Sequence, residues 1–276
     1  TYTVTYADDN SLASTLTAVN ITLNKTGTVS GTISVSGSGS TRAVTISGIT
    51  GNGTLGIAIA SGTATDQAGN LAPAAGPSAA FTVDNTSPVV TISPPSTNIT
   101  TIGSVRYTVS YADANFQSST LTGGRITLNK TGTADGTVSV SGSGNTRTVS
   151  ISNITGDGSL GISIAAGTAR DQAGNTAAAA GPSETFLVDN TPPSLAISAP
   201  SSAFTQTGSV TYTVTYSDEN FLASTLTSAN ITLSKAGTAD GMISVSGSGS
   251  TRTVTISGTT GNGTLGILIA SGTATD

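Results

Sequence analysis

The chain has 276 residues, of which 8% are charged and 4% aromatic, and it contains no Cys, His or Trp. Without Cys or His it has neither a disulfide framework nor a nucleophile–base pair, and its net charge of −5 argues against a nucleic-acid partner. No apolar run reaches the ~18 residues of a membrane helix, so we expect no membrane insertion in this segment. The 36% hydrophobic content and 34 glycines are typical of a folded, turn-rich chain rather than a disordered one.

The sequence repeats itself with a long period. YTVTYAD at 2–8 returns as YTVSYAD at 107–113 and as YTVTYSD at 212–218, a spacing of 105 residues both times. A period of this length is that of a whole domain rather than of a solenoid unit. The predicted domains are 1–84, a repeat lacking its first strand, 85–189, a complete repeat, and 190–276, a repeat lacking its last strand. We therefore expect the chain to be a window onto a longer array.

The complete repeat predicts about seven short strands. In chain order they are 89–93, 104–113, 125–130, 137–144, 146–154, 159–165 and 185–190. Apolar and polar residues alternate in each, as in Val105, Tyr107, Val109 and Tyr111, which is the period of a half-buried strand. Gly- and Ser-rich turns separate them and no helical period is present. The fold class predicted is all-β, as tandem immunoglobulin-like antiparallel β-sandwich domains.

The segment 114–124 is compatible with either a single helical turn or an irregular loop. We expect Phe116, and Phe221 in the third repeat, to plug the core, with Leu12 in that role in the first repeat.

Five motifs recur in fixed order: VDNTxP, YADxNF, GSGxTRTV, GDGxLGI and AGTAxDQAGN. Their combination resembles the tandem bacterial Ig-like (BIg-type) repeats of large extracellular and surface adhesins, over the whole chain. The resemblance implies an extracellular or cell-surface stalk on a bacterium, built from many similar domains. It also implies that calcium at the domain junctions stiffens the rod, as in several such arrays.

Acidic residues gather in the loops that we expect at the domain junctions. In an Ig-like sandwich the loops after the second and sixth strands lie at the pole where the chain enters the domain. At the first junction the candidate ligands are Asp84, Asn85, Asp113, Asn115, Asp171 and Asn175; at the second they are Asp189, Asn190, Asp218, Glu219 and Asp276; and in the first repeat they are Asp8 and Asp66. Carboxylate and amide oxygens suit a hard cation, so the hypothesis is Ca²⁺. The alternative is that these residues only form Asx turns.

Other recurrent charges have simpler interpretations. Lys25, Lys130 and Lys235 lie at the end of a strand, on the same face as its buried Ile and Leu, and either form Lys–Asn isopeptide crosslinks or cover the edge of the core with their stems. Arg42, Arg147 and Arg252 are interpreted as solvated strand starts. Asp157, in GDG, is expected at the opposite pole and is assigned no ligand role.

These patterns favour a structural function over a catalytic one. We expect no enzyme, because the carboxylate pairs lie in repeated loops rather than in one cleft. The first hypothesis is a spacer of an extracellular bacterial adhesin or fibre whose partners are the neighbouring repeats of the same chain. The second is that like chains associate into an extracellular filament or biofilm matrix. The third is a glycan- or protein-binding module.

Overall fold

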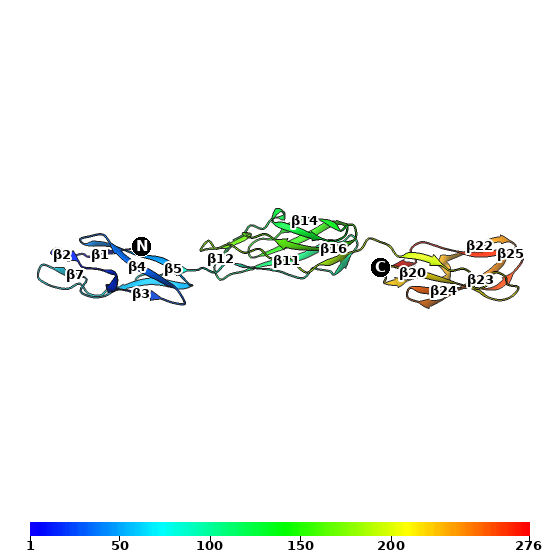
Figure 1. The fold of residues 1–276 in the computed structure, drawn as a ribbon, viewed down its shortest axis with the longest axis horizontal. Helices are drawn as coiled ribbons and strands as arrows, with labels where there is room; N and C mark the ends of the chain where they lie inside the picture. Colours follow the sequence, from blue (N-terminus) through cyan, green and yellow to red (C-terminus); the bar gives the residue numbers. More distant parts are fainter.

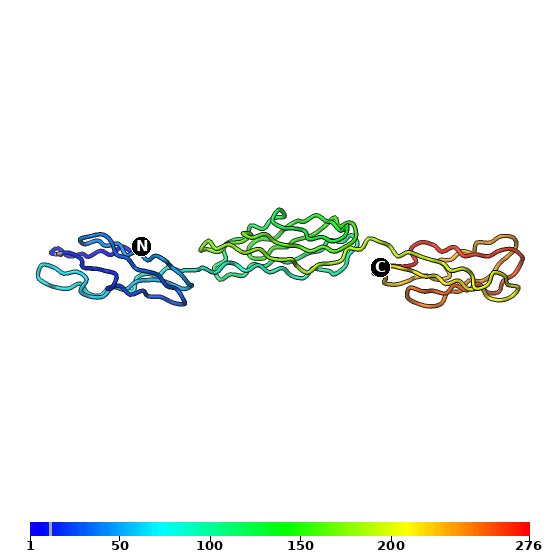
Figure 2. Tube along the Cα trace, viewed as in Figure 1, coloured from blue at the N-terminus to red at the C-terminus, as the bar shows by residue number. Residues whose placement is uncertain are grey.

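The computed structural model describes residues 1–10 and 13–276 and consists of three β-sandwich units that follow one another along the long axis (Figures 1 and 2). Three separate clusters of buried apolar side chains form their cores, and each cluster takes its members from one repeat. The all-β fold class is therefore confirmed. Among the described residues no helix is long and apolar enough to cross a membrane.

The middle unit holds its core between two four-stranded sheets. Their strand orders are β14-β15-β11-β9 and β10-β18-β16-β13. The strands of this unit are β9 (Val89–Ile92), β10 (Ile99–Thr100), β11 (Val105–Ala112), β12 (Phe116–Ser119), β13 (Ile126–Lys130), β14 (Asp135–Ser141), β15 (Thr146–Thr155), β16 (Gly158–Ile164), β17 (Ala169–Asp171) and β18 (Phe186–Val188). Within the two sheets only β10 and β18 run parallel. The arrangement is that of an immunoglobulin-like sandwich.

All seven strands predicted for this repeat are present, and β10, β12 and β17 are additional. These three are two to four residues long, and their sequences do not alternate between apolar and polar residues. The segment 114–124, left open between helix and loop, contains β12 and begins the 3₁₀ turn η2 (Gly123–Arg125). Phe116 packs against the core as predicted, with its ring 6.2 Å from that of Tyr111. The plug predicted at Leu12 lies outside the described residues.

Strand β11 joins the two sheets through its tyrosines. Tyr107 and Tyr111 are 1% and 2% exposed, so their hydroxyl groups need partners inside the protein. The Tyr107 hydroxyl donates to the carbonyl oxygens of Leu160 (3.4 Å) and Glu184 (2.9 Å), and that of Tyr111 bonds the Thr168 hydroxyl (3.1 Å). Burial is the main cause that raises the pKa of Tyr107 above its ordinary value. The tyrosines therefore supply apolar area and also fix the opposite sheet.

The first and third units repeat this plan with fewer strands. The first contains β1 (Tyr2–Thr5), β2 (Ser11–Ser14), β3 (Ile21–Lys25), β4 (Ser30–Ser36), β5 (Thr41–Thr50), β6 (Gly53–Ile59), β7 (Ala64–Asp66) and β8 (Phe81–Val83). The third contains β19 (Ser194–Ile197), β20 (Val210–Ser217), β21 (Ala223–Ser224), β22 (Ile231–Gly237), β23 (Asp240–Ser248), β24 (Thr251–Thr260), β25 (Gly263–Ile269) and β26 (Ala274–Thr275). Two further 3₁₀ turns are η1 (Ala18–Asn20) and η3 (Ser228–Asn230).

The recurrent arginines are not solvated strand starts, so that prediction is wrong. Arg147 donates from Nη2 to the carbonyl oxygen of Leu121 (2.9 Å) and from Nη1 to that of Ser119 (3.2 Å). Arg42 and Arg252 make the bond equivalent to that with Ser119, from Nη1 to the carbonyl oxygens of Ser14 and Ser224. The guanidinium group carries several donors on a planar fork, which allows it to hold the loop after β12 at two points.

We predict that Leu160→Ala strongly destabilises the middle unit. Leu160 is 0% exposed, and deleting a buried leucine side chain costs about 2–5 kcal/mol of unfolding free energy through lost burial and the remaining cavity. Native-state hydrogen exchange of the β15 and β16 amides reports this unit by itself. The matched control is Leu268→Ala on β25, since Leu268 is 66% exposed; we expect it to change exchange in the third unit by about 0.5 kcal/mol or less. Unchanged exchange in Leu160→Ala would contradict the proposed packing.

Candidate metal site at the domain junctions

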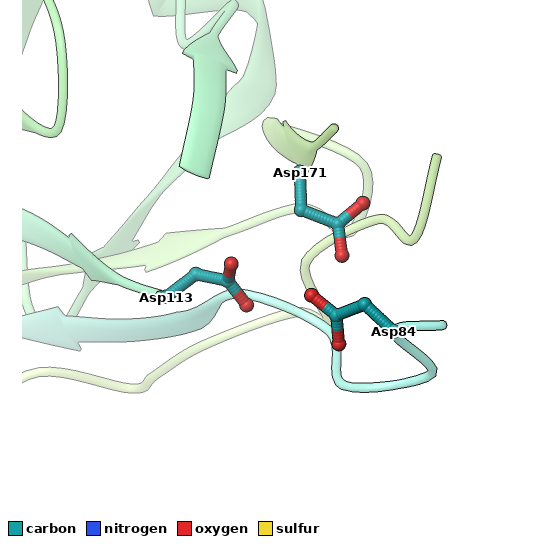
Figure 3. A group of neighbouring side chains, drawn as sticks. All are labelled: Asp84, Asp113 and Asp171. Atoms are coloured by element: carbon teal, nitrogen blue, oxygen red, sulfur yellow. The ribbon is translucent and has the colours of Figure 1, made fainter. Parts of the chain in front are cut away.

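Three carboxylates converge where the first linker meets the middle unit. Asp84 follows β8, Asp113 follows β11, and Asp171 ends β17. One oxygen of each lies within 4.8 Å of the others, and Figure 3 shows the three groups pointing toward one another. Asp171 is 0% exposed. The structure thus brings together one predicted residue from the linker and one from each predicted loop.

The second junction repeats this group. Asp189, Asp218 and Asp276 lie within the same 4.8 Å limit, and Asp189 is 8% exposed. The three residues come from the second linker, from the end of β20 and from the end of β26. Each is 105 residues beyond its counterpart, so the same geometry follows from the same local sequence.

No cationic side chain offsets these charges in the described part of the chain. The salt bridges found there are Lys130–Asp135 and Lys235–Asp240, and both lie away from the junctions. Like charges at this distance repel, and burying a carboxylate without a partner is costly. A cation bound there would reduce this repulsion.

The environment of Asp171 favours the ionised form. Burial by itself raises its pKa, but hydrogen bonds from the Asn175 side chain and from the backbone amides of Asn175, Gly174 and Ala173 together hold that pKa below the ordinary value. At neutral pH the residue is therefore a carboxylate, which is the form that can bind a cation.

The neighbouring asparagine side chains donate to the carboxylates. Asn115 Nδ2 bonds Asp84 Oδ2 at 2.6 Å, and Asn175 Nδ2 bonds Asp171 Oδ2 at 2.7 Å and the Asp84 carbonyl oxygen at 2.8 Å. They were predicted as ligands. In this structure they orient the carboxylates instead, which is the part that surrounding residues commonly take in metal sites.

One orienting residue was missed and one predicted ligand lies outside the group. Asn220 Nδ2 donates to Asp189 Oδ2 at 2.6 Å, as Asn115 does to Asp84. Asn220 could have been found from the sequence, because it lies 105 residues beyond Asn115.

Glu219 was predicted as a ligand, but it occupies the position of Ala114 and is not one of the three converging carboxylates.

The linker asparagines face the preceding unit, so the prediction that they join the next unit's acidic loops is wrong. The Asn85 amide nitrogen donates to Asn52 Oδ1, and its Nδ2 donates to the Gly51 carbonyl oxygen, both at 2.6 Å. Asn190 bonds Asp157 Oδ1 and the Gly156 carbonyl oxygen at the same distances. Each linker is therefore fastened to the hairpin between the last long strands of the unit before it.

This hairpin depends on a glycine that has a positive φ. Gly53 and Gly158 have φ values of +144° and +141°, a region that side chains rarely adopt. Asn52 and Asp157 precede them, and both residue types offer the Oδ1 acceptor that the linker amide needs. Asp157 was assigned no ligand role, and its contact here is with the linker rather than with the carboxylate group.

Asp84 and Asp113 also form the hydrogen bonds of Asx turns. Asp84 Oδ1 accepts from the Thr86 amide (2.9 Å), and Asp113 Oδ1 accepts from the Asn115 amide (2.7 Å). Since a carboxylate offers about four acceptor positions, these bonds leave lone pairs free. Turn formation and cation binding are compatible at these residues.

The three carboxylate oxygens are close enough for one cation to contact all of them. Calcium binds oxygen at 2.3–2.6 Å, so two oxygens bound to one ion are at most roughly 5.2 Å apart, and these oxygens lie within 4.8 Å of one another. A cleft of about 370 Å³ lies beside them, and its lining includes Asp84, Asp113 and Asn115.

In the first unit Asp8 and Asp66 have no third carboxylate beside them within the described residues. Both line a cleft of about 340 Å³ at the corresponding pole. The side-chain hydrogen bond from Asn70 is the main cause that lowers the pKa of Asp66, and this bond measures 2.7 Å.

Two of the three recurrent lysines form ion pairs rather than contacts with asparagine. Lys130 Nζ lies 2.7 Å from Asp135 Oδ1, with side chains 44% and 55% exposed. Lys235 pairs with Asp240 in the same way, whereas the first repeat has Ser30 at the acidic position. For Lys130 and Lys235 the arrangement does not support the isopeptide hypothesis, because each Nζ contacts a carboxylate and the side chain is partly exposed.

Comparison with known proteins adds little. No protein-family model and no curated protein matches the chain. A solved structure of FdeC, described as a broadly conserved Escherichia coli adhesin eliciting protection against urinary tract infections, is similar with 16% identity and a TM-score of 0.33, covering 98% of this chain and 88% of that one. A TM-score this low is insufficient to transfer any property of that adhesin to this chain.

We predict that Lys130 controls the ionisation of Asp135. The hydrogen bond from Lys130 is the main cause that lowers the pKa of Asp135 below 3.8, and the Gly136 amide adds to it. A lowered pKa in the folded state contributes stability above the unfolded pKa, and this contribution is lost as pH falls through the folded value. Carbon-13 NMR titration of the Asp135 carboxyl group should give a pKa that rises toward 3.8 in Lys130→Met. Identical titration curves for the two proteins would show that the ion pair is absent in solution.

Proposed function

We propose that the chain forms structural spacer repeats of an extracellular bacterial adhesin or fibre, and that calcium at the two junctions fixes successive units. The observation that carries this proposal is the composition of the carboxylate groups. At each junction one carboxylate belongs to the linker and two belong to the following unit. A cation bound there would join the linker to that unit.

The hydrogen bonds on the other side of the linker complete the connection. Asn85 fastens the linker to the preceding unit without any cation. A cation at Asp84 would then remove the remaining freedom, because the adjacent residue is already held. Successive units become one rod only when both contacts are present.

A spacer role also agrees with the arrangement of the units. Each has its own core, and the three follow one another along one axis (Figure 1). In such an array the length grows with copy number, while the two faces of each unit stay free of intramolecular contacts. We propose no catalytic role, since the acidic groups occur once per junction and serve to connect units.

We predict that calcium stiffens and stabilises the chain through these groups. Small-angle scattering should show a narrower distribution of interdomain angles with calcium than with EDTA. The melting temperature should rise as well, since calcium at 100 times its dissociation constant adds about 2.7 kcal/mol. The double variant Asp84→Asn/Asp189→Asn should lose both effects, because a neutral amide is a weaker calcium ligand.

The matched control is Asp135→Asn/Asp240→Asn. It removes the same number of charges from acids that pair with lysines away from the junctions, so its response to calcium should equal that of the wild type. The proposal fails if EDTA leaves scattering and melting unchanged, or if both double variants respond alike.

A further inference from the structure

Tension along the chain pulls the first and last strands of the middle unit in opposite directions. The first linker leads into β9 and then β10, and β18 leads into the second linker. The chain enters this unit at the end that faces the first unit and leaves it at the opposite end (Figure 2). The bonds of these strands, all of which lie within the complete repeat 85–189, therefore determine how the unit resists extension.

The strands β10 and β18 are bonded directly to each other as a parallel pair. The amides of Leu187 and Asp189 donate to the carbonyl oxygens of Asn98 (2.8 Å) and Thr100 (3.1 Å). Because the strands are parallel and β18 ends at the second linker, both run toward that linker. A pull on the first linker then draws β10 backward, while a pull on the second draws β18 forward. Since ladder hydrogen bonds lie across the strands, this displacement loads them together, in shear.

The segment before β10 is held in the same way by the other sheet. β9 pairs antiparallel with β11 from Val89 to Ile92. The amides of Ser93 and Ser96 continue this contact by donating to the carbonyl oxygens of Thr108 and Arg106, both at 2.9 Å. Residues 89–100 are therefore bonded first to one sheet and then to the other, and tension loads both contacts along the strands.

Within the parallel pair, β18 is held more firmly than β10. Phe186 and Val188 are each 1% exposed, and on its other side β18 pairs with β16. By contrast, β10 is the outermost strand of its sheet, and its Ile99 is 46% exposed. The hydrogen bonds from β18 are therefore the main attachment of β10, and they limit the tension that the pair can resist.

We infer that the β10–β18 pair is a mechanical clamp that allows the middle unit to bear tension along the chain. Two bonds loaded in shear share the force and break together, whereas bonds loaded from one end break in succession. Forced unfolding depends on the unfolding rate rather than on equilibrium stability, so a short pair at this position raises the resistance to force. This load-bearing function goes beyond spacing, and it arises within one unit.

The test is single-molecule force spectroscopy of the whole chain in two pulling geometries. The chain contains no Cys, so two introduced cysteines define the attachment points. Ser87→Cys/Thr191→Cys places them on either side of the middle unit and loads β10–β18 in shear. Thr101→Cys/Thr191→Cys places both just after β10 and β18, so the pair is unzipped from that end. We expect a roughly twofold higher unfolding force in shear, because two hydrogen bonds share the load.

A second comparison removes one of the two bonds. Leu187→Pro lacks the amide that donates to Asn98, whereas Leu187→Ala keeps that amide while losing most of the same side chain. In the shear geometry Leu187→Pro should unfold at a roughly twofold lower force than the wild type, because one bond is left to carry the load. The matched control Leu187→Ala should unfold at close to the wild-type force.

Equal unfolding forces in the two geometries would overturn the inference, as would equal forces for Leu187→Pro and Leu187→Ala in shear. The three attachment positions are exposed, so the comparison of geometries decides the question even where Leu187→Pro fails to fold. All forces are measured in EDTA, with Ser87→Cys placed after the linker carboxylate Asp84. The result therefore does not depend on whether calcium binds at the junctions.

Discussion

The repulsion between three carboxylates at each junction is the constraint on which the arrangement of the units depends. Asp84, Asp113 and Asp171 come from separate segments and are held with their oxygens within 4.8 Å of one another. Local hydrogen bonds fix each of them, and the bonds at Asp171 keep its pKa low in spite of burial. In the described residues no Lys or Arg forms an ion pair with these carboxylates, and we propose that a cation supplies the counter-charge.

The linker contacts both of the units that it joins. Asp84 takes part in the carboxylate group of the following unit, while the next residue, Asn85, is bonded to the hairpin of the preceding one. Two adjacent side chains thus point to different units. The backward contact uses hydrogen bonds alone. The forward contact also has hydrogen bonds, from Asn115 and Asn175 to Asp84, and in our proposal a cation adds to them. Under this proposal only the forward contact responds to cation concentration.

Much of the fold was predictable because the repeats alternate strictly. The alternation in β11 predicted the buried tyrosines, and the loops that follow β11 and β16 were predicted correctly to lie at the end of the unit where the linker enters.

Other features were not predictable from patterns. Asp84 and Asn85 are neighbours of similar polarity, and which of them contacts which unit follows from hydrogen bonds made only in the folded chain. Arg147 is the second residue of β15, a position that solvated residues also occupy, and its contacts with the carbonyl groups of Ser119 and Leu121 arise from tertiary packing. Asn220 could have been predicted from the 105-residue period, because it is the counterpart of Asn115. The neighbouring Glu219 was assigned as the ligand instead because it is charged.

The most direct test of the central claim is the stoichiometry of calcium binding by isothermal titration calorimetry. With two complete carboxylate groups, the wild-type chain should bind two calcium ions. Asp189→Asn should leave one, at the first junction, and Asp84→Asn should leave the other. Each single variant tests one linker while the other junction serves as the internal control. Absence of binding in the wild type, or two ions retained in either variant, would contradict the assignment of the linker carboxylates to a cation.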